Sequence, residues 1–254
     1  MGAKSADAPR FDVVQFANDN CVALCATIVI IALSFTGAGN ALMVCAMGFM
    51  LCVALLTRRS MKLDLWIFIP LLVYILLCGY ASLRAYDTLT QGYVCVQAVF
   101  LVVYLAVASM DEDEARFLRQ TIVAWVALAA VIGIAFFVFD AFGGVVSRLG
   151  WPLGGANALG IYMVIGWFAL LGLKGGDAAG RILRHAEPLI LVSLALTLSL
   201  GSFGALVIGI IVMLLYSKRD RTWGAVLADA AVLIVKLVIG VGTGICLYLS
   251  LIHI

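Results

Sequence analysis

Nine long apolar stretches, separated by short polar or glycine-rich breaks, limit what this chain can fold into more than any other feature. They lie near residues 20–36, 40–57, 64–83, 92–109, 121–142, 156–173, 188–201, 203–217 and 225–250. A helix of about 20 mostly apolar residues crosses a bilayer, and most of these stretches approach that length. The strands of a membrane barrel are only about 10 residues long and alternate apolar with polar positions. The sequence therefore predicts membrane-spanning helices.

The composition supports the same interpretation. Of 254 residues, 65% are hydrophobic and 12% are charged, whereas a soluble domain is about half apolar and about a quarter charged. A domain of this size has too little interior to bury so many apolar side chains, and a lipid environment removes that requirement. We predict an all-α, polytopic integral membrane helix bundle of about nine transmembrane helices. A polar cytoplasmic segment is expected over 1–19 and a single transmembrane helical domain over 20–254.

Lysine and arginine are distributed unevenly along the chain. If the N-terminus is cytoplasmic and nine spans alternate, thirteen of the 16 Lys and Arg residues fall in cytoplasmic segments. Only Arg84 and Arg148 fall in outer loops, and Lys236 lies inside the last span. Because the cytoplasmic loops of membrane proteins carry an excess of Lys and Arg, this distribution predicts a cytoplasmic N-terminus.

The stretches 188–201 and 203–217 are short for full spans and are parted only by Gly201-Ser202. They form either a tight helical hairpin or one long broken helix. The charge distribution favours the hairpin, because a single span would place outside the basic residues Lys218, Arg219 and Arg221.

Two other polar features carry weaker signals. The acidic run 111–114 precedes the stretch 121–142, and we predict a solvated loop leading into a helix, with a docking or cation site as the alternative. The seven cysteines include no C-x-x-C pair and the chain has two histidines. Neither a metal site nor a disulfide framework is therefore expected.

The outer loop before 156–173 holds the most informative polar residues. Arg148 presents a planar fork of donors suited to phosphate. Asn157 stands where the next helix begins and is a suitable N-cap, and a helix N-terminus also favours an anion. Together they indicate a phosphate site at the outer membrane surface. An interfacial arginine beside a plain N-cap remains the alternative.

Two further charged positions each leave two interpretations open. Arg84, close to Tyr80 and Tyr86, is either a second anion contact or an interfacial anchor with aromatic neighbours. Asp229 and Lys236 share a helix face but lie roughly 10 Å apart along the axis, so they do not pair directly without a third group. They mark either a proton or ion pathway, or an interfacial acid and a lysine that faces other helices or the membrane surface.

Glycines follow in the same last span. The pair Gly240-x-x-x-Gly244 allows close helix packing there. This spacing is common in membrane helices. It predicts a contact with a neighbouring helix without identifying that helix.

At Arg148 the sequence resembles a known family. The segment from Arg148 to Gly160 is similar to the R-x-x-G-x-x-x-N-P-N-x-x-G segment of the O-antigen ligase and O-antigen polymerase superfamily. Residues 194–206 resemble the T-x-S-R-G-A segment of the same family, with Ser202 inside the matching part. Phe203 stands where the family often has Arg, and Ala156 stands where it has Pro.

The resemblance implies a membrane glycosyltransferase. Members of this family take a glycan from a polyprenyl diphosphate carrier at the outer face of the bacterial inner membrane and pass it to another glycan or to a lipid acceptor. They need no nucleotide sugar and no metal cofactor. The resemblance implies diphosphate binding by Arg148, with Asn157 and Ser202 in the matching segments, and it leaves the catalytic residue unknown. Arg84, outside those segments, is predicted from its position as a further diphosphate contact. The implied partners are the bilayer, the polyprenyl-diphosphate-linked oligosaccharide and its acceptor, and not nucleic acid.

The family also carries further spans and a large outer loop with an important histidine after the position where this sequence ends. The residues 249–254 resemble a translated sequencing adapter. We therefore expect the chain to be the N-terminal part of a longer protein, with no biological role for His253.

Two other functions remain open. A transporter or permease would use Asp229, Lys236 and the break near Gly201 as a mid-membrane site, and it predicts a buried Asp229. A scaffold subunit of a membrane complex is the third possibility.

Overall fold

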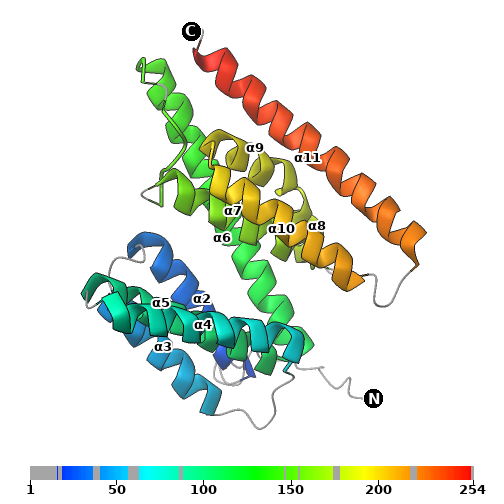
Figure 1. The fold of residues 1–254 in the computed structure, drawn as a ribbon. Coiled ribbons are helices and arrows are strands. Elements are labelled where there is room, and N and C mark those ends of the chain that lie inside the picture. The colour runs from blue at the N-terminus through cyan, green and yellow to red at the C-terminus, as the bar shows by residue number, and fades with distance from the viewer. Residues whose placement is uncertain are drawn as a thin grey trace, which may run out of the picture. The chain divides into compact units, whose positions relative to one another are not determined.

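The computed structural model describes residues 16, 19–36, 41–56, 63–85, 88–145, 147–153, 155–173, 178–217 and 222–252. Within these ranges every regular element is a helix, which confirms the all-α class (Figure 1). The helices are α2 (Cys21–Thr36), α3 (Ala41–Leu56), α4 (Leu65–Ala85), α5 (Thr88–Ser109), α6 (Glu112–Phe142), α7 (Ala156–Leu171), α8 (Ala178–Arg184), α9 (Glu187–Thr197), α10 (Leu200–Ser217) and α11 (Trp223–Ile252). Most of the polar segment predicted over 1–19 lies outside the described residues.

Each of the nine apolar stretches contains a helix, and the structure adds the short helix α8. The prediction of a loop at the acidic run was wrong, because α6 begins at Glu112 and its first turn holds three acidic residues. The carboxylate of Asp111 accepts a hydrogen bond from the Glu114 amide at 2.8 Å and so caps this helix. Acidic side chains are favoured at this end because the helix dipole is positive there.

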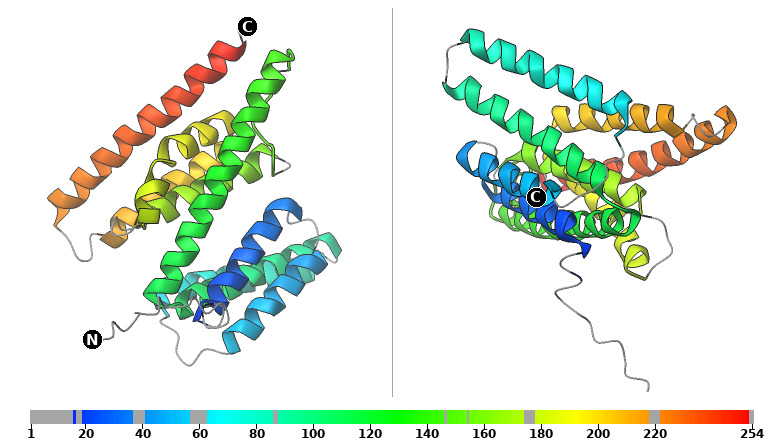
Figure 2. Two further views of the ribbon diagram at one scale, coloured as in Figure 1. Left: turned by 180° about the vertical axis from the view of Figure 1, so that it is seen from behind. Right: turned by 90° about the horizontal axis from the view of Figure 1, so that it is seen from below.

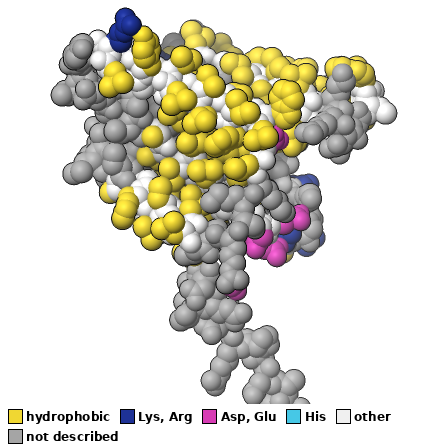
Figure 3. Space-filling model, turned by 60° about the horizontal axis from the view of Figure 1, so that its bottom comes forward, with side chains coloured by type: hydrophobic (Ala, Val, Ile, Leu, Met, Phe, Trp, Pro, Cys, Tyr) yellow, Lys and Arg dark blue, Asp and Glu magenta, His cyan; other side chains and the backbone are white. Residues whose placement is uncertain are grey.

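Four helical segments are long and apolar enough to cross a membrane, namely Leu65–Arg84, Glu112–Phe142, Leu200–Ser217 and Trp223–Leu251. Cys21–Ile31 and Ala156–Leu171 are shorter apolar helices. Large apolar side chains such as Trp66 and Leu200 are exposed on these helices. Hydrophobic side chains also predominate among the described residues on the face in Figure 3. The chain is a helical membrane protein, while nine spans and a cytoplasmic N-terminus stay predictions.

The helices belong to two compact units. Unit 1 comprises Met1–Ile30 and Ala38–Leu118, and unit 2 comprises Ile31–Gly37 and Arg119–Ile254. In unit 1, α5 packs against both α3 and α4. The Tyr104 hydroxyl of α5 donates to the Asp64 carbonyl at 3.0 Å and accepts from the Asp64 amide at 3.1 Å, which fixes the start of α4. The single transmembrane domain over 20–254 stays a prediction.

In unit 2, α6 and α7 are antiparallel. Gly166 of α7 lies against Val126 of α6. Further along α7, Gly172 lies against Arg119, which comes earlier in α6. The contact at Gly166 needs glycine, because an added Cβ would lie 2.5 Å from a methyl carbon of Val126.

Helix α9 runs antiparallel to α7, and α10 returns in the direction of α7. Thr197 at the end of α9 and Ser202 at the start of α10 both lie against Gly160 of α7. Further on, Gly209 of α10 lies against Phe168 of α7. The chain therefore reverses between α9 and α10, as the predicted hairpin requires.

Helix α11 runs parallel to α9 and lies beside it (Figures 1 and 2). Gly240 lies against Leu191, and one turn later Gly244 lies against Ala195. The close packing predicted from Gly240-x-x-x-Gly244 is therefore confirmed, and its partner is α9.

Because of these helix directions, three arginines of unit 2 lie at two different ends of the unit. Arg148 lies at the end where α9 finishes, with its guanidinium on the Thr197 carbonyl. Arg184 lies at the other end, where it donates to the Leu173 carbonyl at 2.5 Å, and Arg119 lies there against Gly172. Arg148 is thus on the opposite end of this unit from these two arginines.

Candidate functional site

The segment containing Arg148 caps the C-terminus of α9. The Leu149 amide donates to the Leu196 carbonyl at 3.0 Å. The Arg148 Nε donates to the Thr197 carbonyl at 3.0 Å, and its Nη2 donates to the Leu198 carbonyl at 3.2 Å. Three consecutive carbonyls that the helix itself leaves unpaired thus receive donors. The negative end of the helix dipole further stabilises a cation at this position.

Asn157 joins the same network, but not as an N-cap. Gly155 is the N-cap of α7 and makes no side-chain cap bond, so the predicted capping role was wrong. The Asn157 Oδ1 instead accepts hydrogen bonds from Arg148 Nη2 at 3.2 Å and from the Ser199 hydroxyl at 3.0 Å. These two donors come from outside α7, which is why the local sequence pattern did not reveal them.

Ser202 is completely buried beneath Asn157. Its hydroxyl donates to the Ser199 hydroxyl at 2.9 Å and also lies 3.4 Å from the Asn157 carbonyl oxygen. Three predicted site residues, Arg148, Asn157 and Ser202, therefore lie in one network that is connected through Ser199. Sequence reasoning missed Ser199, although a serine just before an apolar helix is a typical N-cap. Here its hydroxyl accepts from the Ser202 amide at 3.3 Å.

The break between α9 and α10 lies at Leu198 and Ser199, and not at Gly201-Ser202 as predicted. Leu198 has a φ of 48° and a ψ of 34°, which is the left-handed conformation. Glycine is the usual residue at such a helix end, because a side chain there costs roughly 1–2 kcal/mol. The donors from Arg148 and the Ser199 cap hold the leucine in this conformation.

We expect Leu198→Gly to raise the free energy of unfolding by about 0.5 kcal/mol, because relief of this backbone cost outweighs the lost contacts of a partly exposed side chain. Leu198→Val should lower it by about 1 kcal/mol, since a β-branched residue tolerates positive φ poorly. Thermal unfolding of both variants, followed by circular dichroism in lipid nanodiscs, measures the difference. Equal stabilities for the two variants would contradict this account.

Arg84 lies in unit 1, at the C-terminal end of α4. Its Nη2 donates to the Tyr80 hydroxyl at 2.6 Å, and its guanidinium carbon lies 5.2 Å from the centre of the Tyr80 ring. This geometry matches the interfacial anchor, because cation and aromatic ring stabilise each other at a helix end. Tyr86 lies outside the described residues. A shared site for Arg84 and Arg148 stays a prediction, since the two residues belong to different units.

A pocket of about 540 Å³ opens beside Arg148. The last turns of α6 and the segment after it form its walls, with the residues Phe136, Phe137, Asp140, Ser147, Arg148, Leu149, Gly150, Trp151, Gly155 and Ala156. The hydrogen bonds of Arg148 within the described part of the chain use Nε and Nη2. Both N–H groups of Nη1 are therefore available to a ligand.

Close backbone packing shapes this pocket. An added Cβ on Gly133 of α6 would lie 2.8 Å from the Trp151 carbonyl oxygen. One on Gly150 would lie 2.9 Å from the Ala156 amide nitrogen. Because neither glycine tolerates a side chain, the segment folds tightly onto α6 and onto the start of α7.

Lys236 and Asp229 belong to different parts of unit 2. The Lys236 ammonium lies 2.8 Å and 3.0 Å from the two carboxylate oxygens of Glu187 at the start of α9. The Trp167 indole of α7 donates to the same carboxylate at 3.3 Å. Sequence reasoning did not find Glu187, because the pairing depends on the parallel packing of α9 and α11.

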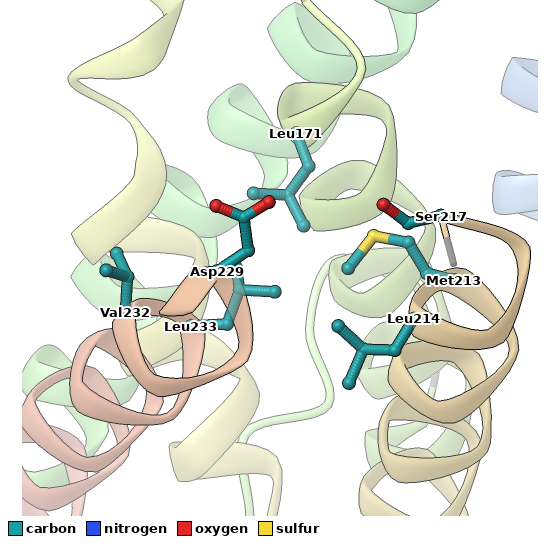
Figure 4. A pocket seen from close by; sticks show the side chains of 7 residues that line it. All are labelled: Leu171, Met213, Leu214, Ser217, Asp229, Val232 and Leu233. Carbon is teal, nitrogen blue, oxygen red and sulfur yellow. The ribbon is translucent and has the colours of Figure 1, made fainter. Parts of the chain in front are cut away.

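Asp229 lines a separate pocket of about 320 Å³ between α11, α10 and the end of α7. Figure 4 shows its carboxylate facing this pocket, with Ser217 on the opposite wall. Asp229 is exposed, whereas the transporter hypothesis predicts a buried one. Within the described residues, no three His, Cys, Asp or Glu side chains are arranged to hold a metal ion.

Comparisons with protein-family models, curated proteins and solved structures found no match to this chain. Arg148, its hydrogen-bond partners and the adjoining pocket are therefore the features that bear on function. The resemblance of 148–160 to the O-antigen ligase and polymerase family remains a hypothesis.

Proposed function

We propose that this chain is a membrane glycosyltransferase of the O-antigen ligase or polymerase type. It binds a polyprenyl-diphosphate-linked glycan at the outer face of the bacterial inner membrane and passes the glycan to another glycan or to a lipid acceptor. The observation that carries this proposal is the position of Arg148 in the wall of a pocket, with the two N–H groups of Nη1 free of bonds in the described part of the chain.

The surroundings of Arg148 suit a diphosphate. Its guanidinium is held by three hydrogen bonds, so little conformational freedom is lost when an anion binds. Guanidinium groups pair with phosphate oxygens through short charge-assisted bonds. The N-terminus of α7 at Ala156 lines the same pocket and adds the favourable end of a helix dipole. Asn157 and Ser202 support Arg148 by fixing its position.

We expect Arg148→Ala to weaken the binding of undecaprenyl diphosphate at least about tenfold, because one charge-assisted hydrogen bond contributes about 1.5–3 kcal/mol. The measurement is the rise in melting temperature that the lipid causes in chain reconstituted in phosphatidylcholine nanodiscs. The variant should also lose about 2 kcal/mol of stability without ligand, since it removes the cap of α9. A variant with reduced stability but an undiminished lipid-induced rise would show that Arg148 is a helix cap only.

Two controls separate charge from position. Arg148→Lys keeps the cation but loses the planar fork, so we expect intermediate binding. Arg181→Ala removes an exposed arginine from α8 and should bind the lipid as the unmodified chain does.

Transfer itself is tested with a radiolabelled glycan on undecaprenyl diphosphate and a lipid or glycan acceptor. Transfer that survives Arg148→Ala would rule out its assigned role.

A further inference from the structure

We infer that the pocket beside Arg148 is a saccharide-binding subsite in which Trp151 stacks on a sugar ring and the Asp140 carboxylate accepts hydrogen bonds from its hydroxyls. The inference rests on the proposed function in one respect, since Arg148 would hold the diphosphate to which the sugar is attached. It adds a ligand class and two residues that the motif resemblance does not assign.

Trp151 presents an aromatic ring at this site in a fixed position. Its side chain is 50% exposed, although the ring packs against Phe136 with centroids 4.1 Å apart. The Trp151 carbonyl meets the surface of α6 at Gly133, which anchors the backbone. Trp151 is thus held on one side and exposed on the other, as a stacking platform requires. A large, rigid aromatic ring binds at low entropic cost.

Asp140 supplies the hydrogen-bond acceptor for the hydroxyls of the sugar. It lines the same pocket as Trp151 and lies in the last turn of α6. Its carboxylate is exposed and makes no hydrogen bond or ion pair within the described part of the chain, including none to Arg148. A carboxylate is electrostatically disfavoured at the negative end of a helix, so the helix itself does not stabilise Asp140. Two oxygens that act only as acceptors suit hydroxyl donors.

The combination of an aromatic ring, a carboxylate and a guanidinium in one pocket suits a sugar better than other ligands. An apolar ligand would displace water from the Asp140 carboxylate and from Nη1 of Arg148 without offering either group a hydrogen-bond partner. A simple anion bound to Arg148 would gain nothing from Asp140 or Trp151. The volume of about 540 Å³ falls within the usual range of small-molecule pockets. A zwitterionic lipid headgroup shares part of this chemistry and is the competitor that the experiment includes.

The test compares two probes in phosphatidylcholine nanodiscs, undecaprenyl diphosphate with and without one N-acetylglucosamine. In the unmodified chain we expect the sugar to strengthen binding about fivefold. Trp151→Ala and Asp140→Asn should abolish that gain, taken as the ratio of each variant's own affinities for the two lipids, and Trp151→Phe should retain most of it. Trp223→Ala and Asp229→Asn change residues of similar exposure elsewhere in unit 2 and should retain the gain fully.

The outcomes separate the two proposals. Equal binding of the two lipids by the unmodified chain, or a gain that persists in Trp151→Ala and Asp140→Asn, would overturn the saccharide subsite. Binding of neither lipid would overturn the proposed function. A titration with free N-acetylglucosamine oligosaccharide would then decide the subsite by itself, with loss of binding in Trp151→Ala as the supporting result. Displacement of the sugar-bearing lipid by phosphatidylethanolamine would assign the pocket to lipid headgroups.

Discussion

Replacing Lys236 with methionine is expected to lower the free energy of unfolding by about 2 kcal/mol, because it leaves a charged, partly buried carboxylate without its cation. Glu187 receives two bonds from Lys236, at 2.8 and 3.0 Å, and one weaker bond from Trp167. The Glu187 side chain is 17% exposed and the Lys236 side chain is 43% exposed, so water reaches the carboxylate less than it reaches the ammonium. Unfolding by detergent titration, followed by circular dichroism, measures the change.

A double-mutant cycle shows whether the loss belongs to the pair. Glu187→Gln alone should cost less, because the Lys236 side chain that it leaves unpaired is 43% exposed. The double variant Glu187→Gln with Lys236→Met should be more stable than the sum of the two losses predicts, since no unpaired charge remains. Additive losses would show that the two residues contribute independently.

A surface pair in the same chain provides the matched control. Arg116 lies 3.4 Å from Asp113 one turn earlier in α6, and here the carboxylate side chain is 87% exposed and the arginine 48% exposed. Exposed pairs contribute little, so Arg116→Met should change stability by no more than about 0.5 kcal/mol. A loss there as large as that of Lys236→Met would mean that burial does not set the cost.

The helices followed from the sequence because their main determinant is local. A continuous apolar stretch commits a segment to a helix in lipid whatever its neighbours are. The contact at Gly240 and Gly244 was predictable for the same reason, because the spacing alone places both glycines on one helix face. The identity of the partner helix was not, since it depends on how the chain folds back.

The site was predictable only in part. Arg148, Asn157 and Ser202 were singled out, and the structure brings them together. Their actual bonds depend on Ser199 and on the carbonyls at the end of α9, which are 42 to 50 residues distant from Arg148 or Asn157 in the sequence. No local pattern encodes such a distance. The N-cap prediction for Asn157 failed because an asparagine at a helix start looks the same whether it bonds its own helix or another.

Replacing Gly160 with valine is expected to cost about 3 kcal/mol of stability and to impair the site at the same time. Gly160 is where α7 touches both the end of α9 and the start of α10. An added Cβ would lie 2.8 Å from the Ser202 Cβ and 3.1 Å from the Thr197 hydroxyl. Neither neighbour can turn away freely, because both side chains are buried and hydrogen-bonded. Overpacking of this kind forces the backbones apart.

Gly204 provides the comparison that makes this prediction sharp. It lies two residues after Ser202 in α10, and an added Cβ there would meet nothing within 4 Å. Gly204→Val should therefore change the free energy of unfolding by no more than about 0.5 kcal/mol, because valine is a slightly better helix former than glycine.

Thermal unfolding and the binding of undecaprenyl diphosphate are measured for both variants. Because separation of α7 from α9 removes Asn157 from Arg148, Gly160→Val should lose binding and Gly204→Val should keep it. Full binding by a folded Gly160→Val variant would mean that the network around Arg148 does not depend on this contact.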